Sequence, residues 1–330
     1  MSGTVLTVIL NYRTPAMTLR AAEAAVQAMK GVEGAIVIVD NDSQDGSFEQ
    51  LIDGTKDLPN TRVLQAGRNG GFGAGNNVGI RAGLPGGVTP DFVYLLNSDA
   101  FPEPGAITYM RDYLLEHPDC GFVGSHVRGE DDVAHVTAFR FPSVWSEFES
   151  AAHTGAISRL LARHVVPMGV PDQPTQIDWC AGASVMFPMR VLDKAGLFDE
   201  AFFLYFEETD LCFRVQEVGY RGMYLPQARV VHIGSASTGM KTWTRMPEYW
   251  FASRSHYFRK RGGRPYLVAV TLSWLVGAAL WKLRRLVERK DERIAPHFVR
   301  DLVRHTMRHL MPRATATQDT ARAQGVPAER

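Results

Sequence analysis

Asp99 ends a polar triplet, Asn97-Ser98-Asp99, that directly follows the apolar residues 93–96. A short run of Val, Tyr and Leu predicts a buried strand, and ligands of open α/β sheets bind beyond the carboxyl ends of the strands. A carboxylate there supplies the oxygen ligand that a hard cation on phosphate groups needs. Taken alone, the triplet fits a turn and helix N-cap before Pro102 and Pro104 better.

Two adjacent carboxylates, Glu207 and Glu208, follow the aromatic residues 202–206. Aromatic neighbours remove water from a carboxylate and raise its pKa toward the range of a general base. The structural alternative is that acids favour the first turn of a helix, where Asp210 also forms an i,i+4 pair with Arg214.

His232 and a glycine-rich segment are the other candidates. His232 closes the apolar residues 229–231, where a histidine is either structural or a metal ligand. Residues 69–80 are dense in glycine, which lets the backbone approach a ligand closely. They match neither G-x-G-x-x-G nor a Walker loop, so a flexible loop is the alternative reading.

Strands must position these residues. Apolar runs at residues 5–10, 35–39 and 61–64 alternate with helices that begin at Pro15 and Phe48, which predicts a parallel, doubly wound sheet. A helix over residues 104–116 and a strand at 121–125 follow, and residues 127–176 are expected to be a loop-rich acceptor side. Strand patterns return at the segments 178–187, 223–225 and 229–231.

Composition describes an ordinary globular protein of 330 residues with 45% hydrophobic and 22% charged residues. Its three cysteines lack CxxC spacing, which favours a reducing compartment over a disulfide framework or a zinc site. Residues 1–10 lack the basic region of a signal peptide. We therefore expect a cytoplasmic location.

Charge is unevenly distributed along the chain. Residues 254–313 hold fifteen Lys or Arg against four acids, whereas the remainder holds 21 basic and 31 acidic residues. This asymmetry predicts an anionic partner for the C-terminal part, either membrane lipid or a polyanion. The apolar residues 266–281 are too few to span a bilayer and have basic flanks. They predict an interfacial or dimer-forming helix, with a plain core helix as the alternative.

Taken together, these blocks resemble family 2 glycosyltransferases of the GT-A fold, and rhamnosyltransferase-like members in particular. The matching blocks occur in the family's order and cover about residues 4–260; they are residues 8–12, 39–46, 69–79, 96–99, 179–182, 198–200, 205–214 and 232–235. Each block is weak alone, whereas the set is highly specific.

The resemblance implies inverting transfer from a nucleotide-activated sugar, with L-rhamnose from dTDP-rhamnose as the expected donor. Glu208 would deprotonate the acceptor hydroxyl, Asp99 and His232 would hold Mg or Mn, and Asp40 would accept from the N–H of the base. Further substrate or nucleotide contacts are implied for Tyr12, Arg13, Asn69, Gly71, Asn76, Asn77, Asn97, Trp179, Glu207 and Asp210. Asp99 is the single carboxylate of its triplet, and Glu208 stands where the family usually has Asp.

The expected organisation is a GT-A domain over residues 1–260, a helical appendage over 261–312 and a disordered tail over 313–330. The expected partners are a nucleotide-diphosphate sugar, a glycan or lipid-linked acceptor and an anionic membrane surface on the inner face of the cell membrane, with a homodimer as a further role of the appendage. No nucleic-acid partner is expected. The alternatives are a nucleotidyltransferase or an inactive nucleotide-sugar-binding or scaffold protein.

Overall fold

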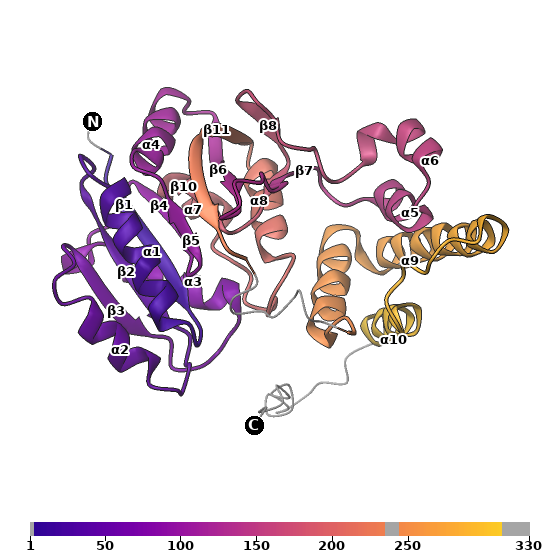
Figure 1. Ribbon diagram of the computed structural model, residues 1–330, viewed down its shortest axis with the longest axis horizontal. Coiled ribbons are helices and arrows are strands. Elements are labelled where there is room, and N and C mark those ends of the chain that lie inside the picture. The colour runs from indigo at the N-terminus through magenta and orange to yellow at the C-terminus, as the bar shows by residue number, and fades with distance from the viewer. Residues whose placement is uncertain (1–2, 235–243, 312–330) are drawn as a thin grey trace.

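The computed structural model describes residues 3–234 and 244–311. An α/β body carries the sheet, and a group of helices forms an appendage beside it (Figure 1). The predicted tail over residues 313–330 lies outside the described residues.

Four parallel strands form the first half of the sheet: β1 (Val5–Asn11), β2 (Gly34–Asp40), β3 (Thr61–Gln65) and β4 (Phe92–Asn97). Helices α1 (Pro15–Ala28), α2 (Ser47–Gly54) and α3 (Phe72–Ala82) connect them. The strands are nearly continuous apolar runs because helices cover both faces of a doubly wound sheet. Side chains alternate, so that Val5 and Ile9 face one core cluster and Leu6 and Val8 face the other.

The second half of the sheet is mixed. Its strands are β5 (Ala100–Pro102), β6 (Cys120–Arg128), β8 (Thr175–Ile177), β10 (Ser184–Pro188) and β11 (Arg221–His232). In the described part of the chain the order is β3-β2-β1-β4-β10-β6-β11-β5, with β8 paired to β11. Strand β10 runs antiparallel to β4 and β6, whereas β11 is parallel to β6. Strands β7 (Ala138–Phe139) and β9 (Trp179–Cys180) form a separate small pair.

Most predicted elements of the body are confirmed, including the four N-terminal strands and the helices α4 (Ala106–Glu116) and α8 (Glu207–Glu217). A shorter helix, α7 (Met189–Ala195), follows β10. Two predicted strands, at residues 223–225 and 229–231, are one strand, β11, with an irregularity between Leu225 and Arg229. The prediction that residues 127–176 are loop-rich is wrong in part, because they contain α5 (Val144–Ala152) and α6 (Gly155–Leu160).

The appendage consists of α5, α6, α9 (Glu248–Glu288) and α10 (Phe298–Leu310). Helix α9 kinks at Gly262 and Gly263, close to the predicted boundary at residue 260, because Gly263 has a φ of 71°. Buried Arg254 donates to Glu147 of α5 and, at 3.4 Å, to Thr271 beyond the kink. These polar contacts fix both halves of α9 against α5.

Candidate active site

The carboxyl ends of the parallel strands β1, β2 and β4 meet at one edge of the sheet. Their register places Asn11 of β1 beside Asp40 of β2, and Leu10 beside Asn97 of β4. Asn97 is half-buried, and its backbone N–H donates to the carbonyl of Ala183 at 3.0 Å. Because ligands bind at this edge in open α/β sheets, the polar residues that follow these strands define the candidate site.

The Asp40 carboxylate is buried and holds the loop that follows it. It accepts hydrogen bonds from Asn11 Nδ2 at 2.7 Å, Ser43 Oγ at 2.6 Å and the Ser43 backbone N–H at 3.1 Å. These contacts fix the backbone of residues 41–43. The predicted hydrogen bond from the nucleotide base to Asp40 remains a prediction. In the structure, the carboxylate accepts hydrogen bonds from Asn11 and from Ser43 of the loop that follows it.

Asn41 is a functional candidate that the sequence reasoning missed. Its Nδ2 donates to Asn69 Oδ1 at 2.9 Å and to the Gly71 carbonyl at 3.2 Å. Its buried Oδ1 has no hydrogen-bond partner among the described residues. A buried acceptor without a partner costs free energy, so Asn41 is suited to accept from a ligand N–H. The only sequence signal was its position next to Asp40.

Tyr12 and Arg13 lie beside the same loop. Arg13 has a left-handed φ of 58°, and its backbone N–H donates to Ser43 Oγ at 2.9 Å. Its Nε donates to the Ser43 carbonyl at 3.1 Å, and its guanidinium lies 5.2 Å from the centre of the Tyr12 ring. The structure therefore places both residues at the edge where they are predicted to contact a nucleotide.

The glycine-rich loop is packed rather than open. Gly71 has a φ of 88°, and a Cβ built there would lie 1.8 Å from the Phe203 carbonyl, which also accepts from the Phe72 N–H at 2.9 Å. Only glycine fits this approach. Asn69 closes the turn, since its Oδ1 accepts from the Gly71 N–H at 3.1 Å. Gly71 therefore fastens this loop to residues 198–206.

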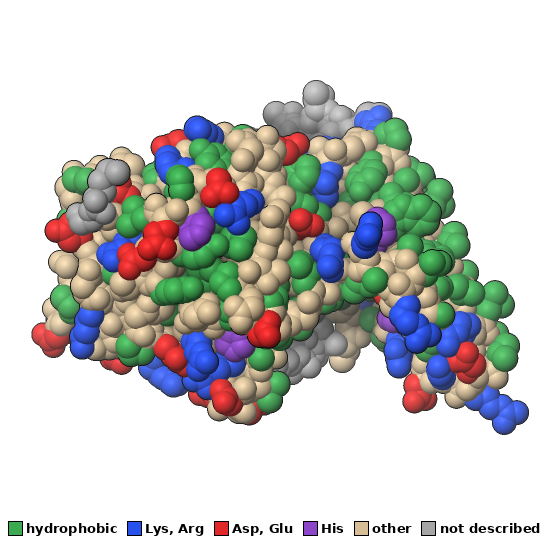
Figure 2. Space-filling model, turned by 90° about the horizontal axis from the view of Figure 1, so that it is seen from above, with side chains coloured by type: hydrophobic (Ala, Val, Ile, Leu, Met, Phe, Trp, Pro, Cys, Tyr) green, Lys and Arg blue, Asp and Glu red, His purple; other side chains and the backbone are tan. Residues whose placement is uncertain are grey.

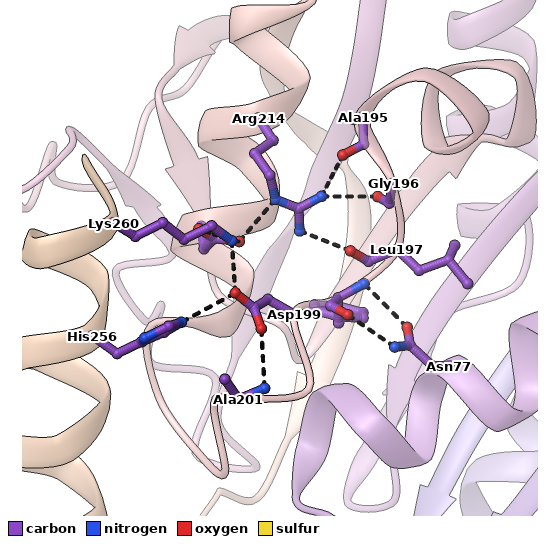
Figure 3. A network of polar contacts seen from close by, with 11 residues as sticks. Asn77, Ala195, Gly196, Leu197, Asp199, Ala201, Arg214, His256 and Lys260 are labelled. Atoms are coloured by element: carbon purple, nitrogen blue, oxygen red, sulfur yellow. Dashed lines mark hydrogen bonds and ion pairs between the residues drawn. The ribbon is translucent and has the colours of Figure 1, made fainter. Parts of the chain in front are cut away.

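The buried amides of Asn76 and Asn77 make internal hydrogen bonds, and their predicted contact with the nucleotide remains a prediction. Asn76 Nδ2 donates to the Phe72 carbonyl at 2.9 Å, within α3. Asn77 bonds the backbone of Phe198 through both amide atoms, at 2.9 and 3.1 Å, and donates to Glu200 at 3.0 Å (Figure 3). The hydrogen bond of Asn76 stays within α3, whereas those of Asn77 hold α3 against residues 198–200.

Glu208 stands in the first turn of α8, after two residues with left-handed backbone, Tyr205 and Phe206 (both φ 69°). It is half-buried, and burial raises its pKa to about 6, although the backbone N–H groups of Glu208 and Gly182 offset part of the rise. Its Oε2 has no partner among the described residues. A carboxylate with this pKa accepts a proton near neutral pH, as a general base must.

Glu207, the neighbour of Glu208, is fully buried. Burial and the neighbouring Glu208 carboxylate raise the pKa of Glu207 well above the usual carboxyl range. Two adjacent carboxylates with different environments separate into one protonated and one ionised group. Burial therefore favours the neutral form of Glu207, whereas the pKa of Glu208 is raised to about 6.

The residues before α8 are tied to the appendage by an ion-pair network (Figure 3). Lys260 of α9 donates to Asp199 at 2.8 Å and to Asp210 at 2.9 Å, and His256 bonds Asp199 at 3.1 Å. Arg214 Nε donates to Asp210 at 2.8 Å, which confirms the predicted i,i+4 pair. The buried Asp210 carboxylate is bound to Lys260 and Arg214, and its predicted contact with substrate remains a prediction.

We expect Lys260→Met to destabilise the protein by about 1–3 kcal/mol at pH 7, because it leaves the Asp199 and Asp210 carboxylates short of a cation. Burial opposes ionisation of Asp199, but hydrogen bonds from Lys260 and His256 outweigh it and hold the pKa of Asp199 well below the usual 3.8. This stabilisation is present above pH 3.8 and is lost as the pH falls toward the lowered pKa.

Melting curves of wild type and variant from pH 8 down to about pH 2 test this, because the stabilisation is lost only below pH 3.8. The matched control is Lys56→Met, since Lys56 pairs with Asp53 at the surface with 66% of its side chain exposed. It should change stability by less than about 0.5 kcal/mol. Equal melting temperatures for the two variants would mean that the network contributes no stability.

Asp99 and His232 come together through strand pairing. Strand β11 pairs with β5 so that His232 lies beside Ala100, and the Ile233 N–H donates to the Asp99 carbonyl at 3.1 Å. His232 Nε2 and Asp99 Oδ1 are 2.9 Å apart, and both side chains are largely buried. Across residues 3–234 and 244–311, no group of three or more His, Cys, Asp or Glu residues gathers to hold a metal. Asp99 and His232 supply one carboxylate oxygen and one imidazole nitrogen. These two ligands fit a metal ion that takes its remaining ligands from phosphate oxygens and water.

Trp179 has a structural environment. Its ring stacks on Phe139 with centroids 4.3 Å apart, and its Nε1 donates to the Arg140 carbonyl at 2.9 Å. These contacts hold β9 to β7 and so fix the segment that reaches Gly182, next to Glu208. Its predicted contact with substrate remains a prediction.

A sequence profile described as "Glycosyltransferase like family 2" matches residues 3–263. The chain belongs to this family. Within it, the chain is 27% identical over 216 residues to the N-acetylglucosaminyl-diphospho-decaprenol L-rhamnosyltransferase of Mycobacterium tuberculosis, covering 62% of this chain and 68% of that protein. It is 26% identical over 166 residues to Rhamnosyltransferase WbbL of Escherichia coli K12, covering 49% of this chain and 60% of that one.

Solved glycosyltransferases share the fold. GalNAc-T7, crystallised with UDP, GalNAc and Mn²⁺, superposes with a TM-score of 0.56 at 13% identity, over 78% of this chain and 50% of its own. The mannosyltransferase PcManGT from Pyrobaculum calidifontis, in complex with GDP-Man and Mn²⁺, gives 0.54 at 14% identity, over 88% and 77%. The predicted GT-A fold is confirmed, and this family 2 member is a glycosyltransferase.

Proposed function

We propose that this glycosyltransferase moves L-rhamnose from dTDP-rhamnose, with inversion, to a hydroxyl of a lipid-linked or cell-surface glycan acceptor. The observation that carries the chemistry is Glu208, a single carboxylate with a pKa of about 6 and one oxygen without a partner among the described residues. The rhamnosyltransferase relatives support the sugar, and the M. tuberculosis enzyme is named for a lipid-linked substrate.

One base is sufficient for this reaction. Glu208 takes the proton of the acceptor hydroxyl, whose oxygen then bonds to the anomeric carbon of the donor sugar. The bond from that carbon to the diphosphate oxygen breaks on the opposite face, so the configuration inverts. Burial and the neighbouring Glu208 carboxylate raise the pKa of Glu207, which favours its neutral form beside the base.

The donor would lie across the edge formed by β1, β2 and β4. Asn41 Oδ1 is suited to accept the ring N–H of thymine, uracil or guanine, whereas adenine and cytosine lack this donor. Asp99 and His232 would hold a divalent ion that neutralises charge developing on the diphosphate. Because one of the two ligands is an imidazole nitrogen, we favour Mn²⁺ over Mg²⁺.

The two alternatives are less well supported. A nucleotidyltransferase needs a glycine-rich loop with a free basic side chain directly after β1, but Arg13 there bonds the backbone of Ser43. An inactive binding or scaffold protein would not need a carboxylate with a pKa raised to about 6 by burial, which costs stability. A cytoplasmic location on the inner face of the cell membrane follows from the proposed acceptor.

The donor is tested by thermal shift with Mn²⁺ and a panel of nucleotide sugars. We expect dTDP-rhamnose to raise the melting temperature more than UDP-GlcNAc or GDP-mannose, because binding to the native state stabilises it in proportion to ligand saturation. NMR of the product should show the anomeric configuration opposite to that of the donor. A larger shift with GDP-mannose, or a product with retained configuration, would overturn the proposal.

A further inference from the structure

The second half of α9 presents an unpartnered apolar face. Five large side chains of this half are exposed by 57–84%. Leu272, Val276, Leu283 and Val287 lie four, seven and four residues apart, and Leu286 lies three residues after Leu283. Residues at these spacings share one side of a helix. At 1.5 Å per residue, the stripe is about 22 Å long.

The opposite side of the same helix is packed. Leu267, Val270, Ala278 and Trp281 are buried, and Gly277 lies so close to α5 that a Cβ there would be 2.5 Å from the Phe148 carbonyl. Thr271 bonds Thr306 of α10 at 3.1 Å. The helix is thus a core element on one face and an exposed apolar surface on the other, which explains why its sequence fitted both predicted roles.

The exposed apolar residues are concentrated in the appendage. Ten of the eighteen exposed large hydrophobic side chains in the described residues belong to α5, α6, α9, α10 and the residue after α10. Figure 2 shows hydrophobic side chains gathered over this end of the molecule, with Lys and Arg beside them. Single exposed apolar residues are ordinary, but a continuous group of this kind marks a contact surface.

Exposed basic side chains of α9 flank one side of this stripe, and others lie on α10. Lys282 and Arg289 are exposed at the C-terminal end of the stripe, and Arg264 is exposed at its other end. On α10, exposed Arg304 and Arg308 alternate with exposed Val303 and Met307. An apolar face with a basic border has the composition of helices that lie in the interface of an anionic membrane.

A spanning arrangement does not fit these contacts. By length and composition, α9 is the one helix among the described residues that qualifies as a membrane span, yet 33% of its most apolar stretch is buried inside the protein. Insertion across a bilayer would strip away α5 and α10 and expose Arg254, which is 1% exposed and paired with Glu147. Lipid contact is therefore limited to the exposed face.

We propose that this stripe, with the basic side chains of α9 and α10, docks on the surface of an anionic phospholipid bilayer. The inference rests on the proposed membrane location and names the surface that achieves it. The first half of α9 holds the segment before α8, since Ser253 Oγ donates to the Leu204 carbonyl at 3.0 Å and Lys260 binds Asp199 at 2.8 Å. Docking would thus fix Glu208 near the bilayer, where a lipid-linked acceptor presents its hydroxyl.

Vesicle flotation of the full chain tests the proposal. Wild type should bind vesicles of phosphatidylcholine with about 30 mol% phosphatidylglycerol, and should bind less in high salt or to phosphatidylcholine alone. The double variant Leu283→Glu with Val287→Glu should bind at least ~10-fold less, since it buries charge in the interface. Ile52→Glu on α2, an apolar side chain of the body with 44% exposure, is the matched control and should bind as wild type.

Three outcomes would overturn the proposal. Equal vesicle binding by wild type and the double variant would show that the stripe does not contact the bilayer. A wild type that is dimeric by light scattering, with a monomeric double variant and no vesicle binding by either, would assign the stripe to a second copy. Retention in membranes after alkaline extraction would indicate a spanning helix. Donor turnover on a soluble acceptor is measured separately, so a wrong sugar assignment leaves this test intact.

Discussion

Replacing Glu208 by Gln is expected to lower kcat by at least ~10²-fold while donor affinity stays close to that of wild type. Gln keeps the shape of the side chain but cannot take a proton from the acceptor hydroxyl. Calorimetry of donor binding and steady-state turnover separate the two effects. Glu217→Gln, an exposed carboxylate at the other end of α8, is the control and should leave kcat unchanged.

The same variant should be more stable than wild type above pH 6. Folding raises the pKa of Glu208 from 4.5 to about 6, so the native state binds more protons between these values, and stability falls as the pH rises through them. Gln removes a cost on the order of 1–2 kcal/mol. The gain in melting temperature should vanish near pH 4.5, and wild-type kcat/KM should rise with pH through about 6.

Substitutions of Glu207 test whether Glu207, rather than Glu208, is the base. Because burial and Glu208 raise the pKa of Glu207 and favour its neutral form, Glu207→Gln keeps a neutral group there and should retain much of the activity. Glu208→Asp should retain part of it, because a carboxylate survives at shorter reach. An active Glu208→Gln beside a folded, inactive Glu207→Gln would move the base to Glu207.

The sequence was informative where local pattern determines structure. Apolar runs such as residues 93–96 become buried parallel strands because both faces of the sheet are covered, and the polar residues that follow them collect at one edge. Glu208 could be singled out because the aromatic residues before it predicted desolvation, and the raised pKa follows from that burial. Asp99 and His232 were identified by their positions at strand ends, which the sheet brings within 2.9 Å.

The sequence could not show where a polar side chain finds a distant partner. Asn77 bonds the backbone of Phe198, 121 residues away, and Asp210 binds Lys260, 50 residues away. By its chemistry, either side chain could bind a ligand. The sequence does not show that the fold supplies an internal hydrogen-bond or ion-pair partner for it.

Residues 127–176 contain four prolines that favoured a loop-rich prediction, but all four lie outside α5 and α6. Helix α5 begins with a capping box formed by Ser143 and Ser146, and it packs against α9.

Asp99→Asn is expected to weaken metal-dependent binding of a nucleoside diphosphate at least ~10-fold, because it removes the single carboxylate of the triplet while keeping the size of the side chain. Calorimetric titration with dTDP, with and without Mn²⁺, measures the change without depending on catalysis. His232→Ala should produce a smaller loss, because an imidazole contributes no charge to the ion.

The matched control is Asp91→Asn at the opposite end of the same strand, where the carboxylate accepts from Thr4 and lies away from the carboxyl edge of the sheet. It should leave the Mn²⁺ dependence of dTDP binding unchanged. If Asp99→Asn binds dTDP with unchanged affinity and the same Mn²⁺ dependence, the metal is not held by Asp99, and the 2.9 Å contact with His232 is a structural link between β11 and the end of β4. If only the Mn²⁺-dependent part of the affinity disappears, the loss identifies Asp99 as a ligand, because the proposed contacts of Asn41 and Arg13 with the nucleotide do not involve the metal.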